Sequence, residues 1–150
     1  MSLDVWLTVP EEEAVSEVER LYIREDGGTR TISRAEWDAR YPGREPLVTR
    51  QYHDGGRVFE ANITHNLNRM ADAAGLYEAC WRPEEIGATR ARDLIAPLRE
   101  GLAQLRAETE RFAQYNPKNG WGSYDGLVSF VTRYLAACEE WPDAEISVSR

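Results

Sequence analysis

The stretch that decides the fold is RVFEANITHNLNRMADAAG, residues 57–75. It follows a glycine turn and its first part, 57–63, predicts a strand. From Thr64 the pattern becomes helical, because the apolar residues Leu67, Met70, Ala71 and Ala74 recur at i, i+3, i+4 and i+7. Gly75 is a typical C-terminal stop. The chain therefore passes from strand to helix at one corner, and we expect a fold that mixes the two.

The N-terminal half is predicted to consist mainly of strands. Residues 3–9 alternate strictly, with Leu3, Val5, Leu7 and Val9 on one face, which indicates a half-buried strand. The further expectations here are a loop or helix start at 11–13, a hairpin of 21–24 with 29–32 around the Asp-Gly-Gly turn, a helix over 34–40 capped by Ser33, an extended segment 47–50 and a second turn at 53–56.

The C-terminal half is predicted to be mainly helical. A helix over 89–105 carries one leucine-rich stripe, and Pro97 inside it should kink it or split it in two. The other expectations are a short turn at 83–86, a short helix within 108–115, a last helix capped by Ser123 and ended by Pro142, and a closing strand over 144–149.

Strands that come first, helices that follow and one returning strand predict an α+β fold in a single domain spanning 1–150. We expect an antiparallel or mixed sheet of about 4–6 strands with about 3–5 helices packed on one face. The closing strand is expected beside 3–9 or beside 57–63.

The net charge of −8 disfavours a general nucleic-acid binder, which would need a basic face. No apolar run is long enough to span a membrane. The N-terminus lacks the basic start and apolar centre of a signal peptide.

Cysteine and histidine usage points away from metal chemistry. Cys80 and Cys138 lie in apolar helical stretches and are predicted to be buried free thiols. With His53 and His65 they lack the spacing of a zinc site, and no metal ligand is predicted. No nucleophile elbow, phosphate-binding loop or dinucleotide fingerprint occurs, so no catalytic residue or cofactor is assigned.

The first candidate site is the strand-to-helix corner. His65 lies in the first helical turn, where the helix dipole favours anions and a neutral imidazole. Asn62 and Asn66 add amide groups within one turn. The alternative is structural: Asn62 or Thr64 caps the helix, and His65 only bonds the backbone.

The second candidate is the loop 116–124. Gly120 and Gly122 bracket Trp121, so the backbone can approach a ligand while the indole projects as a stacking surface. Asn119 adds an amide, and Tyr124 a hydroxyl. In the alternative interpretation, Asn119-Gly120 is a turn, and Trp121 and Tyr124 belong to the core.

Two charged groups complete the candidates. Arg82, Lys118 and Arg150 are the cations that could clamp a phosphate or carboxylate, with surface ion pairing as the alternative. On the polar side of the predicted sheet, Asp4, Glu60 and Glu145 would form an acidic surface if their strands are neighbours.

Several segments together resemble a family of small proteins encoded by tailed phages, prophages and bacterial genomes. The segments that carry the likeness are Ser2-Leu3-Asp4-Val5, Asn62-Ile63-Thr64-His65-Asn66-Leu67 with Met70-Ala71, Trp81-Arg82-Pro83, and Asn116-Pro117 with Asn119-Gly120-Trp121-Gly122. The likeness covers most of the chain except 10–56, which we interpret as a variable insertion containing the hairpin. That family has no established activity, so the resemblance implies a phage or mobile-element setting and a cytoplasmic location in the bacterial host, and it supplies no catalytic assignment.

Three functions follow as hypotheses. The first is binding of a small anionic or nucleotide-like ligand between the His65 corner and the Trp121 loop. The second is an acidic protein-interaction or inhibitor module, in which the partner is a host protein or a second copy of the chain. The third is a hydrolase or transferase that uses His65 as a base.

Overall fold

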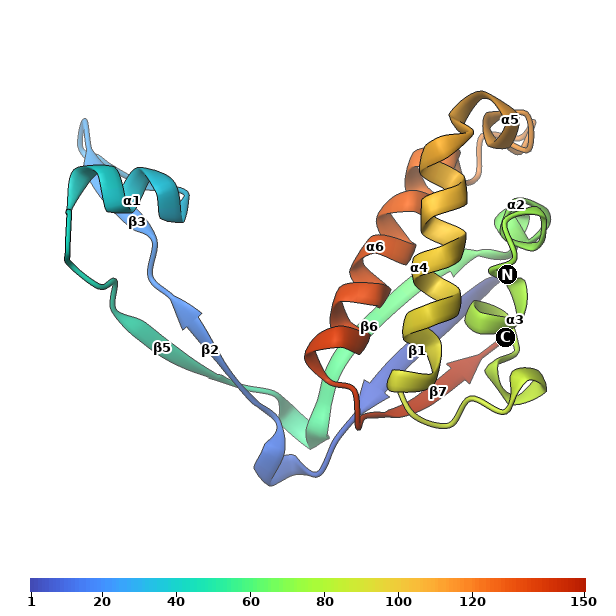
Figure 1. Cartoon of the computed structure of the whole chain (residues 1–150), viewed down its shortest axis with the longest axis horizontal. Helices are drawn as coiled ribbons and strands as arrows, with labels where there is room; N and C mark the ends of the chain where they lie inside the picture. Colours follow the sequence, from blue (N-terminus) through green and yellow to red (C-terminus); the bar gives the residue numbers. More distant parts are fainter.

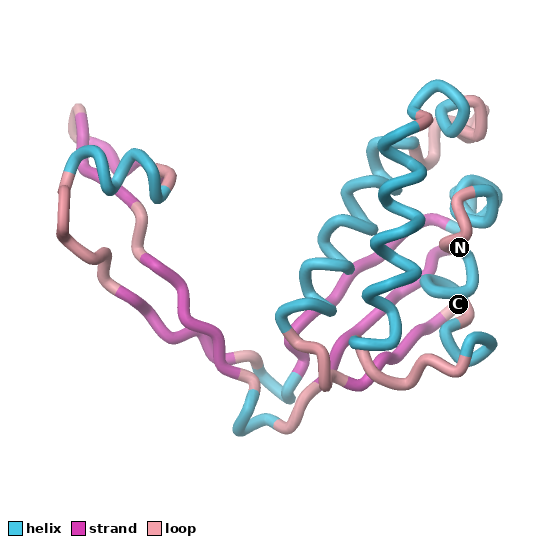
Figure 2. The backbone as a smooth tube through the Cα atoms, viewed as in Figure 1, coloured by secondary structure: helices cyan, strands magenta, loops and turns pink.

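The computed structural model describes all 150 residues and has the predicted α+β architecture. Figure 1 shows two parts: a body of sheet and helices, and an arm that leaves the lower end of the sheet and stands apart from the helices. We call residues 10–56 the arm and the rest of the chain the body. Figure 2 shows that all the longer helices belong to the body, whereas two long strands run through the arm.

The body is built on a three-stranded antiparallel sheet of order β6-β1-β7. Its strands are β1 (Ser2–Thr8), β6 (Arg57–Thr64) and β7 (Glu145–Ser149). The closing strand therefore lies beside the first strand, which is one of the two places expected for it. Residues 10–56 join two neighbouring strands, since Thr8 pairs with Arg57 across the β1–β6 ladder.

The body also contains two 3-10 turns and several α-helices. The two longest helices, α4 and α6, cover one face of the sheet (Figure 1). In chain order, the turns and helices are η3 (His65–Leu67), α2 (Asn68–Ala73), α3 (Tyr77–Trp81), η4 (Pro83–Ile86), α4 (Arg92–Ala107), α5 (Thr109–Ala113) and α6 (Tyr124–Glu140).

The alternation of 3–9 determines which face of the sheet is covered. Leu3, Val5 and Leu7 are fully buried beneath the helices, in a core cluster of 29 residues. Asp4 and Trp6 lie on the opposite face and are half-buried. One strand thus separates the apolar interior from a polar face, as its period of two requires.

Helix α4 passes through Pro97 without a break, so the predicted split is wrong. Pro97 is the sixth residue of the helix, where the missing N–H would have bonded only to the carbonyl of Asp93. Leu94 and Leu98 on either side are fully buried. The Asp93 carboxylate also accepts hydrogen bonds from the backbone of Thr89 and Arg90, which closes the first turn.

The arm consists of two small antiparallel sheets, a helix and short turns. Its elements are η1 (Glu11–Glu13), β2 (Val15–Glu19), β3 (Tyr22–Glu25), β4 (Gly28–Thr31), α1 (Arg34–Arg40), β5 (Val48–Tyr52) and η2 (Asp54–Gly56). The hairpin and the Ser33-capped helix agree with the sequence prediction, and Ser33 accepts the backbone N–H of Glu36 at 3.1 Å. The strands are thus divided among three sheets and do not form one sheet of 4–6 strands.

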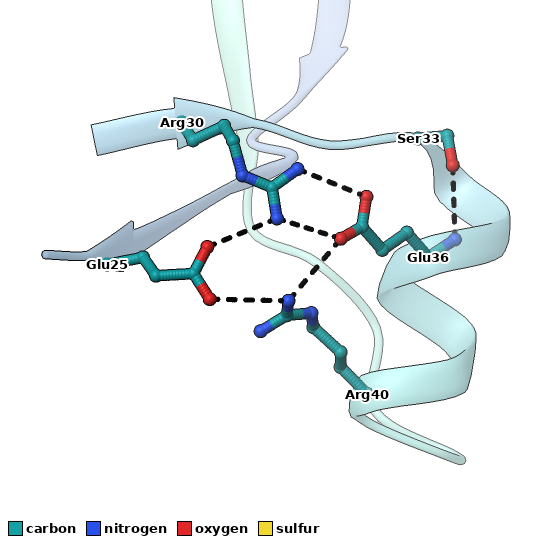
Figure 3. A network of polar contacts seen from close by, with 5 residues as sticks. All are labelled: Glu25, Arg30, Ser33, Glu36 and Arg40. Carbon is teal, nitrogen blue, oxygen red and sulfur yellow. Dashed lines mark hydrogen bonds and ion pairs between the residues drawn. The ribbon is translucent and has the colours of Figure 1, made fainter. Parts of the chain in front are cut away.

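Exposed ion pairs hold the outer part of the arm together. Figure 3 shows Arg30 between Glu25 and Glu36, and Arg40 reaching the same two carboxylates. The hydrogen bond from Arg30, with smaller charge effects from Arg30 and Arg40, holds the pKa of Glu36 below its ordinary value. The helix is therefore tied to the hairpin by charge, with little burial.

The base of the arm is joined to the body by few contacts. The backbone N–H of Val9 in the body donates to the carbonyl of Gly56 at 2.9 Å. Within the arm, the backbone N–H of His53 donates to the carbonyl of Ala14 at 2.9 Å and closes the base. The His53 ring meets Trp141 edge to face, with ring centroids 6.1 Å apart. His53 therefore connects the base of the arm to the body through its contact with Trp141.

Candidate functional site

The two predicted corners of the body are in direct contact. Asn66 donates its side-chain N–H to the carbonyl of Trp121 at 3.2 Å. A Cβ at Gly122 would lie 2.8 Å from Thr64 and 2.9 Å from Leu67, so the loop lies flush on the corner only because residue 122 is glycine. The φ of +99° at residue 122 also favours glycine, because other residues rarely adopt it.

Three adjoining hollows surround Asn66, and we call them together the Asn66 groove. The cationic hollow, about 470 Å³, includes Arg69, Arg111, Tyr115 and Lys118. The middle hollow, about 550 Å³, includes His65, Arg69, Lys118 and Asn119. The indole hollow, about 590 Å³, includes Asn62, Thr64, Asn119 and Trp121. Asn66 lines all three, and each volume is in the range of small-ligand pockets.

No carboxylate lines any of these three hollows. Arg69 and Lys118 have no ion-pair partner, whereas Arg111 is paired with Glu108 at 2.8 Å. Asp72 borders a separate hollow on another side of Arg69. In a chain of net charge −8, the groove is thus a local positive region.

His65 is half-buried and held by the core. The indole N–H of Trp81, which is 2% exposed, donates to Nδ1 of His65 at 2.8 Å. Because Nδ1 accepts, the neutral ring carries its proton on Nε2. A ring in this state offers a ligand a hydrogen-bond donor. No carboxylate is hydrogen-bonded to His65, so an acid–base pair is missing.

Arg82 and Arg150 do not line the groove, contrary to the predicted clamp. Arg150 donates to the carbonyl of Trp81 at 3.1 Å and to Glu84 at 2.7 Å. Arg82 bonds to Tyr77 at 3.4 Å and pairs with Glu85. Both side chains brace the segment that contains Trp81, so their effect on His65 is indirect.

Tyr124 is likewise structural. Its hydroxyl donates to the carbonyl of Leu105 at 2.6 Å, and its backbone N–H donates to the Asn116 side chain at 2.7 Å. Tyr124 therefore anchors the start of α6 and the loop before it. The carbonyl of Leu105 thus uses the hydroxyl proton that was predicted to reach a ligand, and Tyr124 lines none of the three hollows.

Trp121 does not fill the core edge: its side chain is 70% exposed. Its backbone, by contrast, is fixed by Asn66 and by Asn119, whose side-chain oxygen accepts the N–H of Trp121 at 3.0 Å. His65 and Trp121 thus border adjoining hollows that share Asn66 and Asn119, and no single hollow contains both.

The carboxylates on the polar sheet face do not gather into a pair. Asp4 accepts a hydrogen bond from Asn62 at 2.6 Å, Glu60 pairs with Arg57, and Glu145 pairs with Arg90. Each contacts a different partner, and only Glu60 and Glu145 are ion-paired. Asn62 borders the indole hollow, and one N–H of its side chain is already used by Asp4.

The sequence interpretation missed Arg69 and Arg111. Arg69 follows His65 by four residues and lies in the next helical turn, so helical spacing alone could have indicated it. Arg111 lies four residues before Tyr115, and the stretch from Arg111 to Lys118 supplies most of the lining of the cationic hollow, so its nearness to the loop in sequence could have indicated it. Lys118 was recognised as a candidate cation and does line the groove.

The core leaves no reactive thiol or metal cluster. Cys80 and Cys138 are buried free thiols, as predicted, and burial raises the pKa of Cys138 to about 12. No group of three or more histidine, cysteine or acidic side chains is arranged to hold a metal ion. No helix has the length and apolar character needed to cross a bilayer.

Comparisons with protein-family models, with curated proteins and with solved structures find no match.

Proposed function

We propose that the chain binds a small anionic, nucleotide-like ligand in the Asn66 groove. The observation that carries this proposal is that Arg69 and Lys118, both without an ion-pair partner, line hollows that no carboxylate lines. In keeping with the resemblance to phage and prophage proteins, we place this binding activity in an accessory protein of the bacterial cytoplasm.

Most arginines outside the groove are ion-paired with carboxylates, although Arg20, Arg24, Arg44, Arg106 and Arg133 are not. Arg34, for example, contacts Glu19, Asp38 and Glu45. With acidic residues in excess, a cation without a carboxylate partner is available to an outside anion. Forked guanidinium and ammonium groups are the usual partners of phosphate.

The surrounding groups favour recognition over covalent chemistry. The imidazole of His65 presents a donor, since Nδ1 is occupied by Trp81. Both thiols are buried away from the groove surface. Amide groups of Asn66, Asn68 and Asn119 line the middle hollow and can select among polar ligands.

A thermal-shift and calorimetric titration tests the proposal. The probes are inorganic pyrophosphate and nucleoside 5′-monophosphates at matched ionic strength. A ligand at 100 times its dissociation constant should add about 2.7 kcal/mol of stability. We expect the double variant Arg69→Gln, Lys118→Gln to lose this gain. Arg133→Gln, which removes another exposed arginine without an ion pair, should retain it. An equal gain in the double variant would refute the proposal.

A second candidate function, protein interaction, is favoured by one observation on the arm. Most of the large exposed apolar side chains of the chain lie there, namely Val18, Tyr22, Leu47, Val48 and Tyr52. If these side chains form one contiguous patch, it would be typical of an interaction surface. Light scattering across a concentration series tests self-association. A second copy as partner predicts a mass that rises with concentration, and that stays at the monomer value in the Leu47→Ser, Tyr52→Ser variant.

A further inference from the structure

The Asn66 groove has an aromatic side chain at each end and cations between. Tyr115, half-buried, lines the cationic hollow, and Trp121 lines the indole hollow. Arg69 and Lys118 line both the cationic and the middle hollow, so they lie on the path between the two rings. Along the groove, the ring of Tyr115 is therefore followed by the positive charges, then by the amide groups, and then by the indole of Trp121.

Trp121 has the properties of a stacking platform. Its side chain is 70% exposed, so a flat ligand can reach it. Its backbone N–H and carbonyl are both fixed by the side chains of Asn119 and Asn66. Because the backbone is already ordered, stacking on the indole costs little conformational entropy.

The amide side chains beside the indole still have hydrogen-bonding groups that a ligand can use. Asn119 uses its side-chain oxygen for Trp121, which leaves its NH₂ group as a donor. Asn66 uses its NH₂ group, which leaves its oxygen as an acceptor. A donor and an acceptor next to a stacking surface match the polar edge of a nucleobase.

Building on the proposed function, we infer that the preferred ligand is a dinucleotide joined by a phosphodiester. One base stacks on Trp121, the linking phosphate is bound by Arg69 and Lys118, and the second base lies toward Tyr115. A mononucleotide satisfies the cations and one ring only, because no single hollow contains both Trp121 and a cationic side chain of the groove.

Carboxylates lie next to residues at both ends of the groove. Asp4 is hydrogen-bonded to Asn62, which lines the indole hollow, and Glu108 is paired with Arg111, which lines the cationic hollow. A longer strand would bring its further phosphates toward these negative groups. Affinity should therefore rise from one nucleotide to two and should not rise further.

Calorimetric titration with adenosine 5′-monophosphate, the dinucleotide adenylyl-adenosine and a 12-residue oligoadenylate tests this inference. Base stacking predicts that the dinucleotide binds about 5- to 150-fold more tightly than the monophosphate. Trp121→Ala should abolish that advantage, and Trp121→Phe should keep most of it. The control is Tyr52→Ala, which removes an equally exposed aromatic side chain from the arm and should leave the affinities for the three nucleotide ligands unchanged.

The outcomes separate this inference from the function on which it rests. If pyrophosphate binding depends on Arg69 and Lys118 but the dinucleotide gains nothing, or Trp121→Ala keeps the gain, the dinucleotide inference is wrong and anion binding stands. If affinity grows steadily to the 12-residue strand, the ligand is a polynucleotide and the inference is again wrong. If no anion binds through Arg69 and Lys118, both fail.

Discussion

The body and the arm are stabilised in different ways. The body encloses a core cluster of 29 buried residues. In the arm, Ile23 and Ile32 are the buried hydrophobic residues outside that cluster, and exposed ion pairs make up most of the polar side-chain contacts. Burial is strong and resists salt, whereas exposed ion pairs are individually weak and screened. The arm should therefore open under conditions that leave the body folded.

The largest effect is expected from a cavity in the body. Leu98 in α4 is fully buried, and Leu98→Ala should lower the free energy of unfolding by about 2–5 kcal/mol. The matched change on the arm is Leu47→Ala, at a site that is 72% exposed, and it should stay within about 0.5 kcal/mol of wild type. Urea unfolding measures both. Equal losses would mean that the arm is as tightly packed as the body.

Overpacking the same helix should have a smaller effect. A Cβ at Gly101 would overlap the side chain of Leu76, which is fully buried and has no room to shift. We expect Gly101→Ala to destabilise the protein by about 1–3 kcal/mol, despite the better helix propensity of alanine. Gly126→Ala in α6, whose Cβ would meet only the Ser123 hydroxyl at 3.3 Å, is the control and should be close to neutral. Equal losses in the two variants would rule out the proposed overlap.

The two parts also differ in how well the sequence predicts them. Strand β1, helix α1 and the strand-to-helix corner follow from local period and capping. Strand β2 was missed, because Val15–Glu19 has no clear alternation and its partner Val48–Tyr52 lies far along the chain. Pairing between distant segments supplies the structure that the local pattern lacks.

The residues of the candidate site also divide into those that the local sequence pattern predicts and those that it does not. Asn66, Asn119 and Trp121 were recognised from local turn and corner patterns, and the structure brings them together. Arg111 lines the groove beside the loop that follows it in sequence, whereas Arg82 is hydrogen-bonded to Tyr77 and does not line it. Local sequence thus indicates where a site lies, whereas the choice among arginines also depends on side-chain contacts in the folded chain.

Acid should loosen the arm before the body. The pKa of Glu36 is lowered in the folded arm, so its ion pairs contribute stability above the ordinary value of 4.5 and lose it as pH falls through the lowered value. We expect protease cleavage of the arm to accelerate below that range, and Glu36→Gln to cause the same acceleration at neutral pH. High salt should mimic both. Cleavage that does not change with pH or salt would show that the ion pairs do not hold the arm.

Removing the arm should have the smallest effect on the body. Of the arm residues, only Ala14 belongs to the core cluster, and β1 and β6 are already neighbouring antiparallel strands. Replacing residues 10–55 by an Asn-Gly turn would close them into an ordinary hairpin. We expect the shortened chain to keep its helical circular dichroism and, if the groove is the binding site, the ligand affinity of the full chain, since no groove residue lies in the arm. The contact of His53 with Trp141 would be lost, so the end of α6 is where any change should appear. A shortened chain that fails to fold would show instead that the arm is part of the folding unit, and that the few contacts at its base stabilise the body more than their number suggests.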